Sequence, residues 1–246
     1  MAYLLKFGDY VFPATMCPTL PPSDLDLGEQ ERPRASGSTF QVGRKKARLL
    51  AVAGDVTAST PADLATLDAT LRAACVGAGV QKLWLGGDDK YWNAQLQSLA
   101  VNQDGGKMFG LMISYSLLFM AADPDAFAPA STTVAGLGAG GTVTTTGTAI
   151  AQPAWTLTIG STGDNVITIT NAATGEVATI TGTFTAGDVI VLDRAASPMA
   201  VTVNTVATFG VFDGRIPQLG PGANVITVAV ILGAVTLSVT YTERFV

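Results

Sequence analysis

The sequence of 246 residues contains no histidine and only two cysteines. Without histidine, neither a Ser-His-Asp triad nor a Cys-His pair can form, and histidine metal sites are excluded. Two cysteines, Cys17 and Cys75, can neither staple a chain of this length nor build a structural zinc site alone, so both are expected to be free thiols. The sequence therefore predicts no catalytic residue, no bound metal and no cofactor.

Charged residues are also scarce, at 13% of the sequence, whereas 48% is hydrophobic. The net charge of −5 disfavours a nucleic-acid binder that is held by phosphate contacts. Few surface charges leave room for large subunit interfaces. No signal peptide is expected at the start, and no stretch has the apolar density of a membrane span. The segment 108–122 comes nearest, but its alternation and its aromatic residues favour a buried strand.

The charge is unevenly distributed, which indicates a domain boundary. Residues 1–125 hold 11 of the 14 Lys and Arg residues, whereas residues 126–246 hold three arginines and six acids. The second half is instead rich in Thr, Val, Ala and Gly. The turn Asp123-Pro124-Asp125 ends the first part, because proline keeps the preceding residue away from the helical region. We therefore predict two domains, 1–126 and 127–246.

One helix is expected in the first domain, at 59–79. Thr60 is a plausible N-cap and Pro61 suits the first helical position. Apolar residues then recur at helical spacing until Gly77 and Gly79 stop the helix; these residues are Leu64, Leu67, Leu71, Ala74 and Cys75. Around the helix we predict strands at 3–13, 44–58, 81–87, 90–103 (bulged or bent) and 107–121, a proline-rich loop or arm at 17–38, and a hairpin turn at 104–106.

The second domain is predicted to be an antiparallel β-sandwich. Apolar-rich runs, separated by turn residues every 8 to 12 positions in most places, lie at 155–160, 165–172, 176–184, 188–193, 199–204, 223–230 and 234–243. Such spacing is typical of sandwiches. Valine and threonine suit a pleated surface, and threonine keeps the solvent face soluble without charge. The expected fold class is therefore mostly β, with an N-terminal β-sandwich that carries one packed helix.

Three groups of side chains are candidate sites. On a strand, Arg44, Lys46 and Arg48 would share one face, which favours a solvated face or an intersubunit ion-pair surface over a nucleic-acid contact. Trp84, Tyr91 and Trp92 could form a sugar platform but more often fill a core or an interface. The acidic pairs Asp88-Asp89 and Asp123/Asp125 are interpreted as turns, and not as calcium ligands or glycosidase carboxylates.

Turn motifs in the second half resemble those of one family. Three groups of residues match the pattern of the C-terminal domain of siphophage distal tail proteins. They are Asn171, Thr174, Gly175 and Glu176; Gly187, Asp188 and Asp193; and Leu219, Pro221, Gly222 and Asn224. Phe119, Asp123 and Pro124 match the strand ending of the ring-forming, tube-like domain. The resemblance covers roughly 40–125 and 155–246, and each C-terminal motif position suits a turn or a strand end.

The resemblance implies a role as well as a fold. Members of the family form a ring, usually a hexamer, at the distal end of a long noncontractile tail, where it joins the tail tube protein to the tip hub protein. The resemblance implies a virion component that is assembled in the host cytoplasm, through whose channel DNA passes without specific binding. The second, galectin-like domain would project outward and hold a receptor-binding protein or touch a host saccharide. Arg44, Lys46 and Arg48 are then expected at subunit contacts, paired with acids, because basic side chains in the channel would retain DNA.

Two alternatives remain open from the residues. The first is a carbohydrate-binding or receptor-binding module on the virion surface, although the second domain has one tryptophan, Trp155, and no tyrosine before Tyr241. The second is a glycosidase, which is disfavoured because the acids of the second domain lie mostly in turns. The strand faces at 44–50 and 107–121 and the helix at 61–76 are the candidates for the ring interface or its core.

Overall fold

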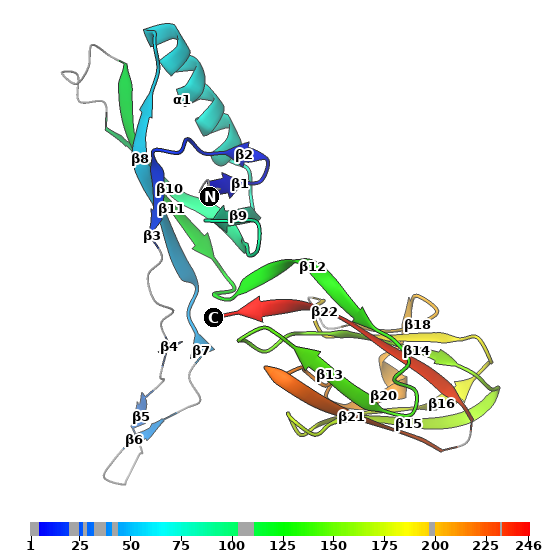
Figure 1. The fold of residues 1–246 in the computed structure, drawn as a ribbon. Helices are drawn as coiled ribbons and strands as arrows, with labels where there is room; N and C mark the ends of the chain where they lie inside the picture. Colours follow the sequence, from blue (N-terminus) through cyan, green and yellow to red (C-terminus); the bar gives the residue numbers. More distant parts are fainter. Residues whose placement is uncertain are drawn as a thin grey trace. The chain divides into compact units, whose positions relative to one another are not determined.

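The computed structural model describes residues 5–19, 25–26, 29–31, 38–40, 44–102, 111–196, 200–231 and 233–246. The chain divides into two compact units, an N-terminal unit of residues 1–127 with Val246 and a C-terminal unit of residues 128–245 (Figure 1). The division falls within strand β12 (Ala126–Val134). Each unit is described by itself, and the ring-forming and galectin-like roles of the two parts stay predictions.

The N-terminal unit is built on one seven-stranded antiparallel sheet. Across the sheet the strands run β2 (Tyr10–Val11), β1 (Leu5–Phe7), β9 (Gln81–Leu85), β10 (Trp92–Asn102), β11 (Met112–Ala121), β8 (Arg48–Thr57) and β3 (Met16–Thr19). Side chains at alternate positions, among them Leu50, Val52, Leu117 and Phe119, are fully buried on one face. The register of β10 against β11 shifts between Leu96 and Ser98, which confirms the expected bulge.

The predicted helix is present as α1 (Pro61–Cys75). Its N-terminus is capped as expected, because the Thr60 hydroxyl oxygen accepts a hydrogen bond from the backbone N–H of Asp63 (3.1 Å). The Thr60 hydroxyl also donates to the Asp63 carboxylate, and this bond lowers the pKa of Asp63. Leu64, Leu71 and Cys75 are buried, whereas Leu67 is 38% exposed.

Helix α1 is fastened to the sheet through Asp68. The buried phenol of Tyr115 on β11 donates to Asp68 Oδ1 (2.7 Å), and Arg72 Nε pairs with the same oxygen (2.7 Å). Burial raises the pKa of Tyr115, and the hydrogen bond to Asp68 raises it further. The helix therefore covers the face of the sheet on which Tyr115 lies, beside β8 (Figure 1).

Three predictions for the first domain were wrong in detail. The expected strand at 3–13 is the hairpin β1–β2, which turns at Gly8, where φ is +57°. The expected strand at 44–58 is broken at residues 46–47 into β7 (Arg44–Lys45) and β8. The expected loop at 17–38 begins within β3, an edge strand of the large sheet.

The rest of the 17–38 segment is described in part. Strand β4 (Leu25–Asp26) pairs with β7, and β5 (Glu29–Glu31) pairs with β6 (Ser38–Phe40). The hairpin turn that was predicted at 104–106 lies outside the described residues. No helix in the described part of the chain is long and apolar enough to cross a membrane.

The C-terminal unit is an antiparallel β-sandwich of two sheets. The first sheet is ordered β12, β22 (Val235–Phe245), β14 (Ala154–Ile159), β17 (Val189–Asp193), β18 (Ala200–Val203) and β19 (Val206–Ala207). The second is ordered β13 (Gly141–Thr145), β21 (Gly222–Ile231), β15 (Gly163–Asn171), β16 (Glu176–Phe184) and β20 (Phe212–Gly214). The predicted mostly-β fold is confirmed. In this unit no strand was predicted at the bounds of β12, β13, β19 or β20, and the short 3-10 turn (Phe209–Val211) was also missed.

The core of the sandwich lies between the two sheets. It is formed by aliphatic side chains that alternate along the strands, with Trp155 as its largest fully buried member. Threonines of the same strands, such as Thr156 and Thr168, point the other way. The buried indole needs a partner for its N–H, and it finds one in the carbonyl oxygen of Pro217 at 2.9 Å.

Candidate functional site

Two asparagines from separate motifs meet in the interior of the C-terminal unit. Asn171 at the end of β15 and Asn224 in β21 are both fully buried, and Asn171 Nδ2 donates to Asn224 Oδ1 (3.0 Å). Asn224 also accepts from the N–H of Gly220 (2.8 Å) and donates to the carbonyls of Gly220 (2.8 Å) and Gly222 (3.0 Å). This one side chain therefore fixes the turn before β21, with every bond directed at the backbone or at Asn171.

The segment before that turn is held by a second motif residue, Glu176. Its Oε2 accepts from the N–H of Gln218 (2.7 Å), and its Oε1 pairs with Arg194 Nη1 (3.2 Å). Arg194 in turn donates to the carbonyl of Ile216. Because both charged side chains are mostly buried, the ion pair holds the 216–218 backbone in place and is not a free surface charge.

The remaining motif residues shape turns. Gly175, Gly187 and Gly222 have φ of +69°, +96° and +86°, a region that side chains disfavour. Asp188 accepts from the N–H of Thr185 (2.7 Å) and from Asn204 Nδ2 (2.8 Å), and the bond from Asn204 is the main cause of its lowered pKa. The interpretation of these positions as turn and strand-end residues is confirmed, and none of them forms a catalytic arrangement in the described part of the chain.

The basic cluster does not lie on a continuous strand. Residues 46–47 separate β7 from β8, so strand alternation does not carry from Arg44 to Arg48, and the reasoning that placed three basic side chains on one face does not hold. Lys46 is exposed. Arg48 is half-buried, and its guanidinium lies 5.7 Å from the ring centroid of Trp92. An interface role for Arg44, Lys46 and Arg48 stays a prediction.

The aromatic group is packed and leaves no open sugar platform. Trp92 is buried, and its indole N–H donates to the carbonyl of Pro124 (3.2 Å). Tyr91 is 9% exposed, and its ring stacks on the ring of Phe127, with the centroids 5.8 Å apart. The ring centroid of Trp84 lies 5.1 Å from that of Tyr91, and Lys82 Nζ lies 4.4 Å from the Tyr91 centroid. These contacts therefore favour the interpretation that the rings are core and packing residues.

The acids and the thiols occupy separate, local settings. Asp123 accepts from the N–H of Asp125 (3.1 Å), as expected of a turn. Among the described residues, no three His, Cys, Asp or Glu side chains are grouped as metal ligands would be. Cys17 and Cys75 are both free; Cys17 is exposed, whereas burial raises the pKa of Cys75 to about 11.

The strand faces that are expected at the ring interface or its core, at 44–50 and 107–121, include an apolar surface in the structure. Opposite the face that α1 covers, cross-strand neighbours Leu49 and Met120, and Ala51 and Leu118, form an apolar strip beside exposed Ala53. Leu49 is 44% exposed. We call these five residues the open strip. Its signal in the sequence is the unbroken apolar run in β8 and in the second half of β11, which is typical of a strand that is covered on both faces.

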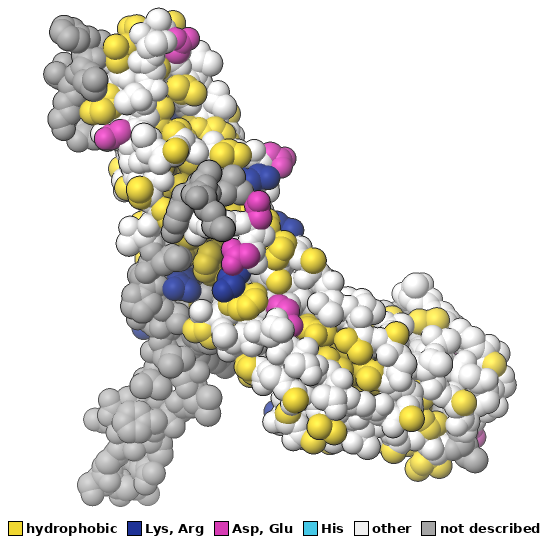
Figure 2. Space-filling model, viewed as in Figure 1, with side chains coloured by type: hydrophobic (Ala, Val, Ile, Leu, Met, Phe, Trp, Pro, Cys, Tyr) yellow, Lys and Arg dark blue, Asp and Glu magenta, His cyan; other side chains and the backbone are white. Residues whose placement is uncertain are grey.

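Charged side chains gather over the N-terminal unit in the view of Figure 2, whereas the surface of the C-terminal unit in that view is nearly uncharged. The same contrast is present in the sequence, since residues 128–245 carry no lysine and three arginines. Two of these arginines are engaged within the unit: Arg194 pairs with Glu176, and Arg244 is 8% exposed. The C-terminal unit therefore presents an uncharged to weakly acidic surface.

Comparisons with known proteins agree with this architecture. Residues 146–245 match the family model described as "Siphovirus-type tail component, C-terminal domain". The crystal structure of the Dit protein of phage SPP1, described as a paradigm of the hub adsorption apparatus of phages that infect Gram-positive bacteria, is similar over 100% of both chains, with a TM-score of 0.77 and 13% identity. No curated protein matches the sequence.

Two structures of the phage p2 baseplate in its activated conformation, with Sr and with Ca, are weaker likenesses. Each is 7% identical and covers 96% of this chain and 90% of that chain, with TM-scores of 0.45 and 0.43. Scores this low carry no argument about this chain.

The two β-rich units have the fold of the SPP1 Dit chain, and the turn network lies in the segment that matches the siphovirus-type tail component domain. The match of residues 146–245 to the C-terminal domain of siphovirus-type tail components confirms the resemblance to the siphophage distal tail proteins.

Proposed function

We propose that the chain assembles with copies of itself into a ring, a hexamer by the resemblance, at the distal end of the tail, between the tail tube protein and the tip hub protein. In this proposal the N-terminal unit closes the ring, and the C-terminal unit is the outer platform on which other tail proteins attach. The protein has a structural role and no enzymatic one. It acts in the virion after assembly in the host cytoplasm, and DNA crosses the ring without a specific contact.

The observation that carries the proposal is the likeness of fold over the full length of the SPP1 Dit chain. A likeness restricted to residues 146–245 would fit any protein that carries this outer domain. The N-terminal unit supplies a second argument, because Leu49 and Ala53 of the open strip are exposed and the other three residues are half-buried in the single chain. Ring closure needs one face of each subunit to contact a different face of the next, and an apolar strip with few charges lowers the desolvation cost of such a contact.

The mass of the full-length protein in solution tests the proposal. Native mass spectrometry and light scattering over a range of concentrations are expected to show one discrete closed assembly, and negative-stain images are expected to show a ring with a central channel. An open series of masses that grows with concentration would contradict ring closure. A monomer that still fails to assemble when purified hub protein is added would overturn the proposal.

The predicted interface residues are tested by reversing one charge. Lys46→Glu is expected to weaken the ring, because an acid would then face acids of the neighbouring subunit. Arg215→Glu is the matched control, since Arg215 is an exposed base of the C-terminal unit and the change in net charge is the same. If both variants form the ring as well as the wild type does, Lys46 does not lie in the subunit interface.

The alternative of a carbohydrate-binding module has less support from the side chains. Sugar recognition commonly uses an exposed aromatic ring beside polar groups. In the described part of the C-terminal unit, Trp155 and Tyr241 are both buried. Binding of a glycan by a chain that remains monomeric would favour the alternative over the ring.

A further inference from the structure

The outward face of the five-stranded sheet in the C-terminal unit has an unusual composition. Half of its residues are threonine and most of the others are aliphatic. They are Thr142, Thr144, Ala223, Val225, Thr227, Ala229, Ile231, Asp164, Val166, Thr168, Thr170, Val177, Thr179, Thr181, Thr183 and Asp213. We call this set the threonine face. It has two acids and no base, and three of its aliphatic side chains are well exposed: Ile231 at 62%, Val225 at 51% and Val177 at 40%.

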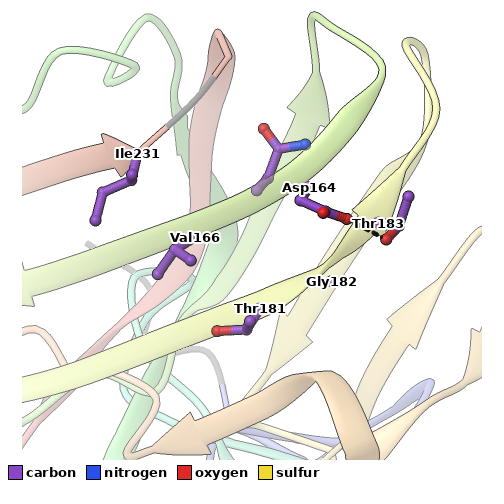
Figure 3. Close-up of a pocket in the computed structure, with 7 residues that line it drawn as sticks. Asp164, Val166, Thr181, Gly182, Thr183 and Ile231 are labelled. Atoms are coloured by element: carbon purple, nitrogen blue, oxygen red, sulfur yellow. Dashed lines mark hydrogen bonds between the residues drawn. The ribbon is translucent and has the colours of Figure 1, made fainter.

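One end of the threonine face is hollowed. A hollow of about 290 Å³ is lined by Asp164, Asn165, Val166, Thr181, Gly182, Thr183 and Ile231 (Figure 3). A second hollow of about 450 Å³ is lined by residues 161–165 and Gly233, so the two share Asp164 and Asn165. The first volume is near the lower limit for ligand pockets, which suits one long side chain better than a whole small molecule.

The walls of the first hollow differ in character. Val166 pairs across the strands with Ile231 on one side and with Thr181 on the other, so these three side chains form one row. Asp164 and Thr183 are the next cross-strand pair, and the Thr183 hydroxyl donates to the Asp164 carboxylate (Figure 3). Gly182, between Thr181 and Thr183, also lines the hollow, and a Cβ atom there would meet the Phe184 ring on the inner face of the sheet. An aliphatic wall therefore lies opposite a carboxylate.

The electrostatics of the hollows favour a positively charged occupant. Asp164 is exposed and is the one charged residue in the two linings. Behind it, Asn165 is 2% exposed; its Nδ2 donates to the carbonyl of Gly163 (2.8 Å), and its Oδ1 accepts no hydrogen bond from any described residue. A buried acceptor without a donor adds to the negative potential of the carboxylate.

We propose that the threonine face docks an extended segment of a partner tail protein, and that a lysine or arginine of this segment lies across the hollow. Its methylene groups pack on Ile231 and Val166, and its cation pairs with the Asp164 carboxylate. Long basic side chains commonly bury their apolar stems and leave the charged end at a polar group. The inference rests on the platform role proposed above and names the surface and the chemistry of its partner.

Charge complementarity selects this occupant. The C-terminal unit has few bases of its own to offer, since Arg194 and Arg244 are engaged or buried. Two C-terminal units of different copies would therefore bring acid against acid. A saccharide would find no aromatic ring among the residues of the threonine face.

The test uses the full-length chain with methyl-labelled isoleucine and valine, and a defined peptide as the probe. The peptide is acetyl-Gly-Thr-Val-Lys-Val-Thr-Gly-amide, and its matched control has norleucine in place of lysine, which keeps the stem and removes the charge. Titration with the lysine peptide is expected to shift the methyl signals of Ile231 and Val166. Both the norleucine peptide and the variant Asp164→Asn are expected to bind about threefold more weakly, as an exposed ion pair predicts.

Asp213→Asn is the control variant, because it removes the other acid of the face, which lines neither hollow, and it is expected to bind like the wild type. Equal shifts with both peptides, or no shift at either methyl group, would overturn the inference. Light scattering is run on the same samples. If Asp164→Lys changes the mass of the assembly, the face contacts another copy and the partner assignment is wrong. If the wild type forms no ring even when purified hub protein is added, the proposed function fails whatever the titration shows.

Discussion

Truncation of Asn224 to alanine is expected to unfold the C-terminal unit at a clearly lower temperature. The side chain is fully buried and forms hydrogen bonds within its own motif segment, to Gly220 and Gly222, and to Asn171 of another motif segment. Every one of these partners is in the interior or in the turn before β21. A buried polar group that loses its partner costs about 1–3 kcal/mol.

The size of the stability loss depends on which former partners of Asn224 still form another hydrogen bond in the variant. The carbonyls of Gly220 and Gly222 still accept from the Thr145 hydroxyl, at 2.8 and 3.4 Å. The N–H of Gly220 and one hydrogen of the Asn171 amide lose their acceptor, although the second amide hydrogen still has the carbonyl of Gln218. Two orphaned donors give a loss of about 3 kcal/mol, which lowers the melting temperature of a unit of this size by roughly 10 °C.

The assay is calorimetry of the full-length protein combined with hydrogen exchange of its peptides. The melting transition assigned to the C-terminal unit is expected to move, and amides of 217–224 are expected to exchange faster. Thr227→Val is the matched control on the same strand, since its side chain is exposed and keeps its β-branched shape. A shift for Asn224→Ala no larger than that of the control would refute the reasoning that the buried asparagine pair holds the turn.

Further predictions concern the thiols, the helix contact and one glycine. In a Cys17→Ser background, Cys75 is expected to react with a thiol reagent only after unfolding. Burial raises the pKa of Cys75 from 9.0 to about 11, so the folded state keeps the proton that the unfolded chain loses. Stability is therefore expected to fall by about 2 kcal/mol as the pH rises from 9 to 11, and a flat denaturation profile over this range would contradict it. Tyr115→Phe removes the hydrogen bond to the helix carboxylate and is expected to cost about 1–2 kcal/mol in urea unfolding. Gly147→Ala places a Cβ atom against a backbone carbonyl of β22 and is expected to lower the free energy of unfolding by about 2 kcal/mol. In the matched control Gly210→Ala the added Cβ atom has no neighbouring atom within 4 Å, so no change is expected in the same melting assay.

Local rules were sufficient for much of the fold. Thr60, Pro61 and Asp63 lie within four residues of one another, so capping chemistry alone predicted where α1 begins. Seven strands of the C-terminal unit, β14 to β18, β21 and β22, were predicted to within two residues, because the buried positions alternate along them. Prediction failed where an element is too short to show a period, as in β19 and β20.

The predicted site depended on contacts that a local pattern does not contain. Arg44, Lys46 and Arg48 have the spacing of one strand face, but the strand is broken at residues 46–47, so the prediction that the three side chains share a face loses its basis. The aromatic residues Trp84 and Tyr91 have the composition of a sugar platform, and only the packing of Phe127 and Lys82 on Tyr91 shows that the ring is covered.

The sequence by itself determined the class of the protein. The absence of histidine removed whole groups of catalytic sites, alternation and turn spacing predicted a two-part β protein with one helix, and turn motifs pointed to the distal tail family. These properties depend on residues close together in the chain. Only the tertiary structure decided that Asn171 meets Asn224 across 53 positions, that the open strip faces away from α1, and that Asp164 lies opposite Ile231 in a hollow. Strand order and register set those meetings, and both depend on long-range pairing that single strands do not encode.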